Sequence, residues 1–188
     1  MWDKTVPMIS LAMRAGSLEG LPTFNVPEPY GWRFYRPGDE RFWAEIETSA
    51  GEFDHPGKGL ERFQSVFRDG NLEERMIFLT DGGVPFATAT AWHESASEGR
   101  LHWVSVDAAH QGRGLSRVIV SLAMQQLRTL GYRSAYLTTQ TASWVAIKVY
   151  HRFGFRPVLR AHADEEVGWQ IVSEKTGIDF MQCLQAGR

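Results

Sequence analysis

The chain has 188 residues, 43% of them hydrophobic and 22% charged, which is the composition of a single folded domain with its own core. Lysine and arginine total 20 against 22 aspartates and glutamates, and a formal net charge of −2 provides no general basic field, so we expect no nucleic-acid partner. The single cysteine, Cys183, excludes an intrachain disulfide and a thiolate-rich zinc site, and no apolar run reaches the roughly 18 residues of a membrane span, so we expect a cytoplasmic protein with no metal site and no membrane partner.

The first 29 residues are predicted to be a proline-rich extension. Five of the eight prolines fall within the first 37 residues and fix the backbone against long helices. Apolar side chains also occur here, at Val6, Met8, Ile9, Leu11 and Met13. We therefore expect the extension to dock on the body of the protein, with a surface for a binding partner as the alternative.

Residues 30–160 are predicted to form the main domain, followed by a C-terminal helical tail over 161–188. Runs rich in aromatic and β-branched residues predict strands, and apolar residues three or four positions apart predict helices. In chain order the predicted elements are a strand over 31–36, helices over 40–48 and 60–67, strands over 75–80, 84–93 and 101–106, a helix over 115–130, a strand over 134–139, a helix over 144–153, a strand over 155–159 and a helix over 164–175. This order indicates one mixed α/β layer structure.

Turn and cap residues mark several of these boundaries. Asp39 can cap the first helix, and Gly57 and Gly59 are predicted to separate the two short helices. Asp81-Gly82-Gly83 is a strong hairpin signal, because glycine tolerates the positive φ of the turns that join paired strands. Gly131 is placed to end the long helix.

A glycine-rich loop joins the predicted strand over 101–106 to the long helix. It reads His110-Gln111-Gly112-Arg113-Gly114-Leu115-Ser116-Arg117. Glycines allow a ligand to approach the backbone closely, and the first amides of a helix have no partners within the helix, so an anion can bind there. The helix dipole and Arg113 or Arg117 add favourable charge. The loop therefore predicts a site for a pyrophosphate.

Two common nucleotide motifs are excluded at this loop. The third glycine of a dinucleotide fingerprint would fall at Arg117, and the next strand closes with Thr138 and Thr139 instead of an acidic residue for a ribose hydroxyl. No Gly-Lys-Ser/Thr follows the glycines, as a nucleotide-hydrolysing P-loop requires.

The loop instead resembles the acetyl-coenzyme A (acetyl-CoA) loop of the GNAT superfamily of N-acetyltransferases, Gln/Arg-x-x-Gly-x-Gly/Ala. Here it reads Gln111-Gly112-Arg113-Gly114-Leu115-Ser116, with serine at the last small position. A second family motif, Asn-x-x-Ala-x-x-x-Tyr-x-x-x-Gly-Phe, resembles Ser143-x-x-Ala146-x-x-x-Tyr150-x-x-x-Gly154-Phe155. The resemblance covers residues 75–159 well and implies an α/β (α+β) fold, in which helices flank a mixed, mostly antiparallel twisted sheet of about six to seven strands.

The resemblance implies acetyl-CoA as the co-substrate and a primary amine of a small molecule, peptide or protein terminus as the acceptor. The pyrophosphate would lie on the glycine loop, and the pantetheine would pair with the main chain of residues 101–106 like an added strand. A main-chain amide near residues 104–106 would stabilise the oxyanion. The predicted coenzyme-binding residues are Val104, Ser105, Val106, Gln111, Gly112, Arg113, Gly114, Leu115, Ser116, Arg117 and Ser143.

Two residues are candidate catalytic groups. Tyr150 resembles the family's general acid, which protonates the departing thiolate. His102 is the candidate general base, because strand alternation places it on the face of Val104 and its ordinary pKa suits proton uptake. His93, Glu94 and water are the alternatives to His102 as the base. The tryptophans nearest the predicted cleft, which either pack in the core or line a substrate pocket, are Trp92, Trp103 and Trp144.

Direct attack in a ternary complex is expected, because Cys183 lies far from both motifs and offers no evident nucleophile. A non-catalytic coenzyme A binding or regulatory module is the alternative, with the same loop and no turnover. A partner-binding domain whose proline-rich extension is the functional part would not bind the coenzyme. The sequence leaves the identity of the acceptor and the presence of a homodimer open.

Overall fold

The computed structural model of the chain describes residues 2–68, 70–160 and 164–186. Its strands are β1 (Ser10–Ala15), β2 (Gly31–Phe34), β3 (Met76–Asp81), β4 (Val84–His93), β5 (Glu98–Val106), β6 (Ser134–Gln140) and β7 (Arg156–Val158). Its α-helices are α1 (Glu40–Ala50), α2 (Pro56–Val66), α3 (Leu115–Thr129), α4 (Trp144–Arg152), α5 (Glu165–Thr176) and α6 (Phe180–Ala186), and its short 3-10 turns are η1 (Leu72–Glu74), η2 (Ala108–His110) and η3 (Thr141–Ser143). All the strands and helices predicted from the sequence are present, β4 with the predicted bounds and the others with shifted boundaries.

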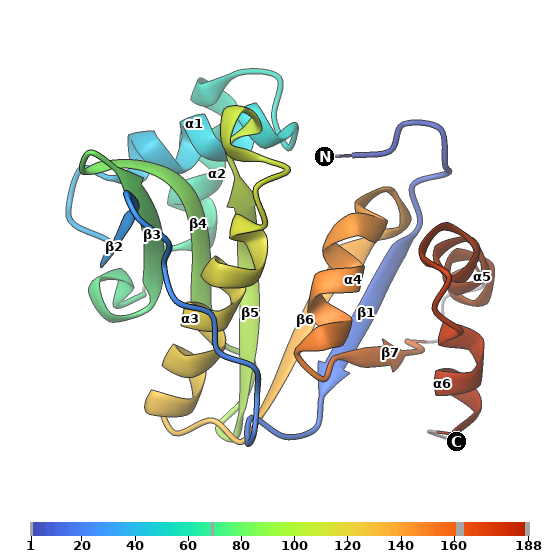
Figure 1. Cartoon of the computed structure of the whole chain (residues 1–188). Helices are drawn as coiled ribbons and strands as arrows, with labels where there is room; N and C mark the ends of the chain where they lie inside the picture. Colours follow the sequence, from blue (N-terminus) through green and yellow to red (C-terminus); the bar gives the residue numbers. More distant parts are fainter. Residues whose placement is uncertain (1, 69, 161–163, 187–188) are drawn as a thin grey trace.

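The seven strands form one sheet in the order β2-β3-β4-β5-β6-β1-β7 (Figure 1). Every neighbouring pair is antiparallel except β5 and β6, which are parallel. On β3, Met76 and Phe78 pack with α1 and α2, whereas Ile77 and Leu79 pack with α3, because successive side chains of a strand point to opposite faces. The predicted α/β (α+β) fold, a mixed and mostly antiparallel sheet flanked by helices, is confirmed.

Strand β1 was not predicted, although it lies inside the sheet between β6 and β7. Its Leu11, Ala12 and Met13 are fully buried, so the strand has no alternation of apolar and polar residues for sequence analysis to detect. Part of the proline-rich segment is thus docked as an internal strand. The division of the chain at residues 29 and 160 stays a prediction.

Two sequence predictions about α1 and α2 are wrong: the cap at Asp39 and the position of Gly57 and Gly59 between the helices. Asp39 makes no side-chain cap bond to α1, and its carboxylate instead accepts hydrogen bonds from the side chain of Arg33 at 2.9 Å and the amide of Arg36 at 2.7 Å. Helix α2 begins at Pro56, so Gly57 and Gly59 lie inside it. The cause is local: proline suits the first turn of a helix, and the His55 ring accepts a hydrogen bond from the amide of Gly57 at 2.9 Å.

Strands β5 and β6 are paired only where they begin. The ladder joins residues 98–100 to residues 134–136, and beyond it the two strands diverge (Figure 1). On its other side β5 carries a bulge, because its register against β4 shifts between Thr88 and Thr90 and Trp103 adopts a φ of 48°. A bulge bends its strand and twists it more strongly. The sheet is therefore open along the second half of β5.

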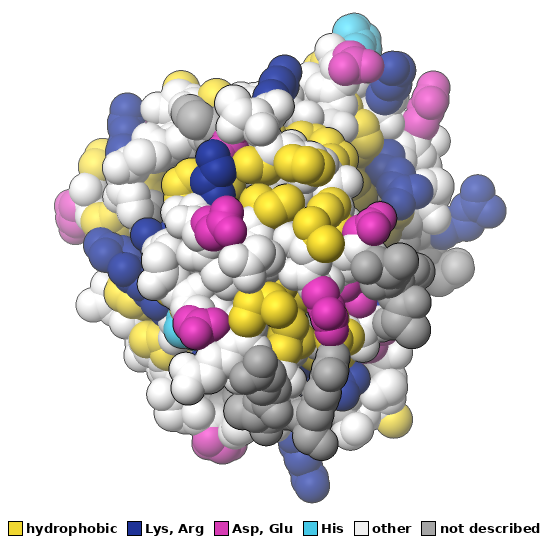
Figure 2. Space-filling model, turned by 90° about the vertical axis from the view of Figure 1, so that its right-hand side faces the viewer, with side chains coloured by type: hydrophobic (Ala, Val, Ile, Leu, Met, Phe, Trp, Pro, Cys, Tyr) yellow, Lys and Arg dark blue, Asp and Glu magenta, His cyan; other side chains and the backbone are white. Residues whose placement is uncertain are grey.

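Helices α5 and α6 cover the β1 and β7 end of the sheet, and α6 was not predicted. Trp169 of α5 and Phe180 of α6 are fully buried. Their outer face carries apolar side chains between charged ones (Figure 2). In the described part of the chain, no helix has both the length and the apolar composition needed to span a membrane.

Candidate active site

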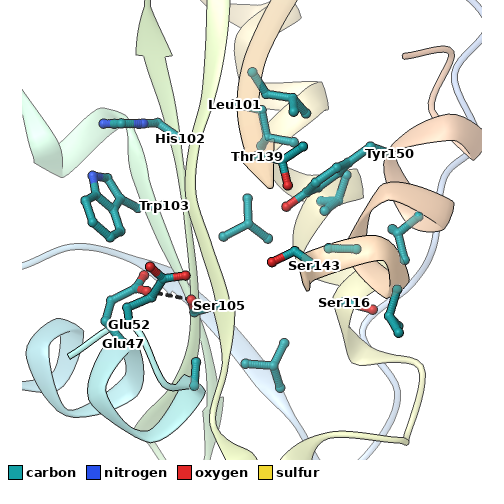
Figure 3. Close-up of a pocket in the computed structure, with 18 of the residues that line it drawn as sticks. Glu47, Glu52, Leu101, His102, Trp103, Ser105, Ser116, Thr139, Ser143 and Tyr150 are labelled. Carbon is teal, nitrogen blue, oxygen red and sulfur yellow. Dashed lines mark hydrogen bonds between the residues drawn. The ribbon is translucent and has the colours of Figure 1, made fainter. Parts of the chain in front are cut away.

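A cavity of about 570 Å³ lies where β5 and β6 separate (Figure 3). Residues 101–106 of β5 and residues 137–140 of β6 form its sides. The start of α3 and one side of α4 line it as well, so both predicted motifs reach the same space. Among the described residues, no group of three or more His, Cys, Asp or Glu side chains is arranged to hold a metal ion.

The glycine loop forms the end of the cavity at α3. Gly112 and Gly114 line the cavity and have φ values of 76° and 74°, in the left-handed region that favours glycine. The side-chain amide of Gln111 donates to the carbonyl of Val106 at 2.9 Å and ties the loop to the end of β5. No side chain of the described residues caps α3, so the amides of its first turn, including that of Ser116, have no partner within the helix. A loop of this kind can hold a phosphate group.

The two arginines of the loop point elsewhere. Arg113 donates to the hydroxyl of Tyr30 at 2.8 Å, and the guanidinium of Arg117 lies 5.2 Å from the ring centre of Phe24. Both partners belong to the segment between β1 and β2, which runs along α3 (Figure 1). Neither arginine is among the residues that line the cavity in the described structure. Only their main-chain amides are available to a ligand in this arrangement.

The predicted face of His102 is wrong. His102 and Trp103 both point toward the α1 and α2 side, where the His102 ring lies 6.0 Å from that of Phe67. Val104 and Val106 pack into the core on the α3 side. The bulge at Trp103 inserts one residue and reverses the alternation that the sequence pattern assumed.

His102 lines the cavity but is a weak proton acceptor. Burial lowers its pKa to about 3, and the positive charges of Arg100 and Arg62 act in the same direction. The ring therefore stays neutral across the physiological range. Of the predicted alternatives, neither His93 nor Glu94 is among the described residues lining the cavity, and Glu94 is paired with Arg100 at 3.1 Å.

Helix α4 contributes Tyr150, Ala146 and the residue before its first turn, Ser143, to the cavity wall. Tyr150 is 7% exposed, and its hydroxyl points into the cavity (Figure 3). Burial raises the pKa of Tyr150, so the phenol stays protonated at neutral pH. Ser143 makes no side-chain cap bond to α4, and its hydroxyl instead accepts a hydrogen bond from the side chain of Gln140 at 3.1 Å.

The sequence analysis missed a buried carboxylate, Glu47, which reaches the cavity from α1. Glu47 is fully buried, and its Oε2 accepts a hydrogen bond from the hydroxyl of Ser105 at 2.6 Å, whereas its Oε1 has no hydrogen-bond partner among the residues that the structure describes (Figure 3). Burial raises its pKa to about 8. The sequence contained a signal: Glu47 is four residues after Trp43 and therefore lies on the apolar face of an amphipathic helix, where a charged residue is unusual.

Two more residues on the α1 side were missed, Glu52 and Trp2. The Trp2 side chain hydrogen-bonds to Glu52, and both line the cavity. The neighbouring residue Asp3 makes two hydrogen bonds to the α4 side. Its main-chain amide donates to the carbonyl of Ala142 at 2.9 Å, and its carboxylate accepts from the indole of Trp144 at 3.1 Å. The start of the described chain thus links the α4 side of the cavity to the α1 side.

Glu47 predicts a pH-dependent stability. Because burial raises its folded-state pKa from 4.5 to about 8, the folded protein holds a proton that the unfolded chain releases between these values. The free energy of unfolding should therefore fall as pH rises through this window. Urea unfolding of both proteins at about pH 5 and about pH 9 measures this effect. Between these two pH values the free energy of unfolding of wild type should fall by about 4 kcal/mol more than that of Glu47→Gln, which cannot ionise. Equal losses in the two proteins would contradict the assignment.

The sequence model of the Acetyltransferase (GNAT) family matches residues 31–155 of the chain. The chain is 28% identical over 159 residues to a mycothiol acetyltransferase of Nocardia farcinica, an alignment that covers 77% of this chain and 50% of that protein. It is 29% identical over 141 residues to a mycothiol acetyltransferase of Thermomonospora curvata, with 72% of this chain and 47% of that protein covered. The chain thus spans about half the length of these curated relatives.

Two solved structures illustrate the shared fold. A GCN5-related N-acetyltransferase from Sphaerobacter thermophilus superimposes with a TM-score of 0.63 and 22% identity, over 79% of this chain and 48% of that chain. The ribosomal-protein-S18-alanine N-acetyltransferase of Escherichia coli gives a TM-score of 0.59 and 22% identity, over 69% of this chain and 79% of that chain. At these identities the likeness concerns the fold alone.

Proposed function

Because the chain belongs to the Acetyltransferase (GNAT) family, we propose that it transfers the acetyl group of acetyl-CoA directly to a primary amine in a ternary complex. One observation carries the proposal: the glycine loop before α3 and Tyr150 on α4, which are separated in sequence, line a single cavity between the diverging strands β5 and β6. A family fold without this shared cavity would not support transfer.

The residues of the cavity suit acetyl-CoA. The uncapped start of α3 offers main-chain amides to the pyrophosphate, with Gly112 and Gly114 allowing close approach. Beyond residue 100, β5 is not paired with β6, so its main chain is free to pair with the amide groups of the pantetheine. Ser105 contributes only main-chain groups to this pairing, since its side chain binds Glu47 on the opposite face.

The chemistry needs an oxyanion donor and an acid. The coenzyme supplies a thioester, whose carbonyl carbon the acceptor nitrogen attacks. Main-chain amides of residues 104–106 stabilise the negative charge on the carbonyl oxygen. Tyr150 donates a proton to the departing sulfur; a phenol is a weaker acid than a thiol, so the value of Tyr150 lies in its position.

The acceptor is a primary amine of a small molecule or peptide. The relatives reported above are named for mycothiol, but the chain spans only about half their length. The proposal therefore extends to a primary amine and not to a particular amine compound. A single cysteine and an acetyl-CoA requirement fit a reducing cytoplasm.

Release of free thiol from acetyl-CoA across a panel of amines tests this function. The panel should include alkylamines, amino sugars and peptides with free α-amino groups. We expect thiol release that depends on the amine, with an acetylated product detected by mass spectrometry. Coenzyme binding without turnover would favour a non-catalytic binding module, and an absence of coenzyme binding would favour a partner-binding domain.

A further inference from the structure

The proposed transfer requires the acceptor to lose a proton before it attacks. An alkylamine has a pKa of about 10 and is almost entirely protonated at neutral pH. The predicted base, His102, holds a proton poorly because burial lowers its pKa to about 3. Another group must therefore take this proton, either directly or through water.

Glu47 is placed to do so. Helix α1 carries it into the cavity from the face opposite α3, and Ser105 of β5 occupies one of its two carboxylate oxygens at 2.6 Å. The second oxygen, Oε1, is buried and has no hydrogen-bond partner among the described residues. Leaving a buried polar atom unpaired is unfavourable, and more so when the group is charged, so an unpaired carboxylate oxygen in a cavity wall points to a ligand.

We propose that Glu47 binds the ammonium group of the acceptor through Oε1 and accepts its proton, and that Ser105 positions the carboxylate for this role. This inference rests on the proposed function. It also defines the acceptor more closely, as a primary amine that enters the cavity as a cation.

The residues around Glu47 favour the binding of a cationic amine. Glu52 adds a second carboxylate on the same wall and raises the pKa of Glu47 by charge repulsion, after the larger effect of burial. The ring of Trp103, stacked near Phe53 with centroids 5.9 Å apart, provides an apolar surface beside the carboxylates. The other titratable or charged groups lining the cavity are Arg62, Arg100, His102, His110 and Tyr150.

One turnover releases one proton to solvent for each ammonium group that is acetylated. The ammonium passes one proton to the Glu47 carboxylate, and the neutral nitrogen forms the new C–N bond as the C–S bond breaks. Tyr150 gives its proton to sulfur and regains one from the nitrogen through water, after which Glu47 releases its proton to solvent. Burial raises the pKa of Glu47 to about 8, so Glu47 is a stronger proton acceptor than an ordinary glutamate, and the carboxylate form that takes the proton increases as pH rises toward that value.

Glu47→Gln tests the proposal, because glutamine keeps the size of the side chain and can still accept the hydrogen bond from Ser105. We expect kcat/KM for an alkylamine to fall by about 100-fold or more at neutral pH, with an unchanged Kd for acetyl-CoA. Glu45→Gln is the matched control, since Glu45 lies on the exposed side of the same helix, and it should retain wild-type activity.

The choice of amine separates proton transfer from a structural role. α-Amino groups have a pKa of about 8 and alkylamines of about 10, so a larger share of an α-amine is already neutral. The loss in Glu47→Gln should therefore be at least about 10-fold greater for the alkylamine, and it should shrink as pH rises toward 10. Equal losses for the two amines at every pH would overturn the proposal, as would a loss smaller than about threefold.

Variants of Ser105 and Glu52 test whether the acid limb of the pH profile belongs to Glu47. The Ser105 hydrogen bond lowers the pKa of Glu47, so Ser105→Ala should move the acid limb of the pH profile to higher pH, and Ser105→Thr should restore it. Glu52→Gln should keep an acid limb, which would disappear if Glu52 were the base. If wild type acetylates no amine, the proposed function fails and this inference falls with it; if wild type and Glu47→Gln are equally active, only this inference fails.

Discussion

Gly114→Glu should lower the affinity for acetyl-CoA by at least about 100-fold, which is about 2.7 kcal/mol of binding free energy. Gly114 precedes α3 with a φ of 74°, and a Cβ there would lie 3.4 Å from the guanidinium of Arg117. A side chain at this position is therefore strained. Its carboxylate would also compete for the amides at the start of α3 that we assign to the pyrophosphate, and would repel that group.

Gly131→Glu is the matched control for this variant. Gly131 follows the other end of α3 with a φ of 88°, and no atom lies within 4 Å of a Cβ placed there. The same substitution thus imposes a similar backbone strain of about 1–2 kcal/mol, away from the cavity. Calorimetry should show lost coenzyme affinity in the Gly114 variant and near wild-type affinity in the Gly131 variant. Comparable affinities in the two variants would contradict the assigned site.

Tyr150→Phe should lower kcat by about 100-fold, while the Kd for acetyl-CoA stays close to that of wild type. Phenylalanine keeps the ring that packs near Phe155, with centroids 6.1 Å apart, and removes only the hydroxyl that faces the cavity. The departing sulfur then loses its positioned proton donor. Steady-state kinetics at saturating coenzyme and amine measure this effect.

Tyr132→Phe provides the comparison for Tyr150. The Tyr132 hydroxyl accepts a long hydrogen bond from Arg75 at 3.4 Å and lies outside the cavity wall, so its removal should leave kcat unchanged. The thermal stability of both variants should stay near that of wild type. A kcat for Tyr150→Phe within about twofold of wild type would remove Tyr150 from the mechanism.

The role of β1 affects how the first residues can be studied. This strand pairs with β6 on one side and β7 on the other, and its side chains are buried. Removing the proline-rich segment would therefore take an internal strand out of the sheet. Point substitutions at Trp2, which touches Glu52 without belonging to the sheet, are better suited to test this segment.

Features with local causes were predictable from the sequence. Helices α3 and α4 follow from apolar residues at helical spacing, and the β3–β4 hairpin follows from Asp81-Gly82-Gly83. The glycine loop is also local, since Gly112 and Gly114 adopt the positive φ that glycine permits. These elements were enough to identify the family resemblance and the side of the cavity that we assign to the coenzyme.

The side of the cavity that we assign to the acceptor was decided by tertiary structure. The bulge at Trp103 turned His102 away from the face of Val104, because an inserted residue reverses strand alternation, and no sequence period records such an insertion. The pairing of Glu47 with Ser105 joins residues far apart in the chain, so it exists only after α1 packs on β5.

The sequence by itself determined the identity of the elements and the loop before α3, because helix periodicity, turn chemistry and the freedom of glycine act over a few neighbouring residues. Tertiary structure alone decided that β5 and β6 separate, that β1 enters the sheet and that a carboxylate from α1 is buried opposite Tyr150. These properties arise from long-range packing, whose outcome depends on many residues at once and leaves no short pattern in the chain.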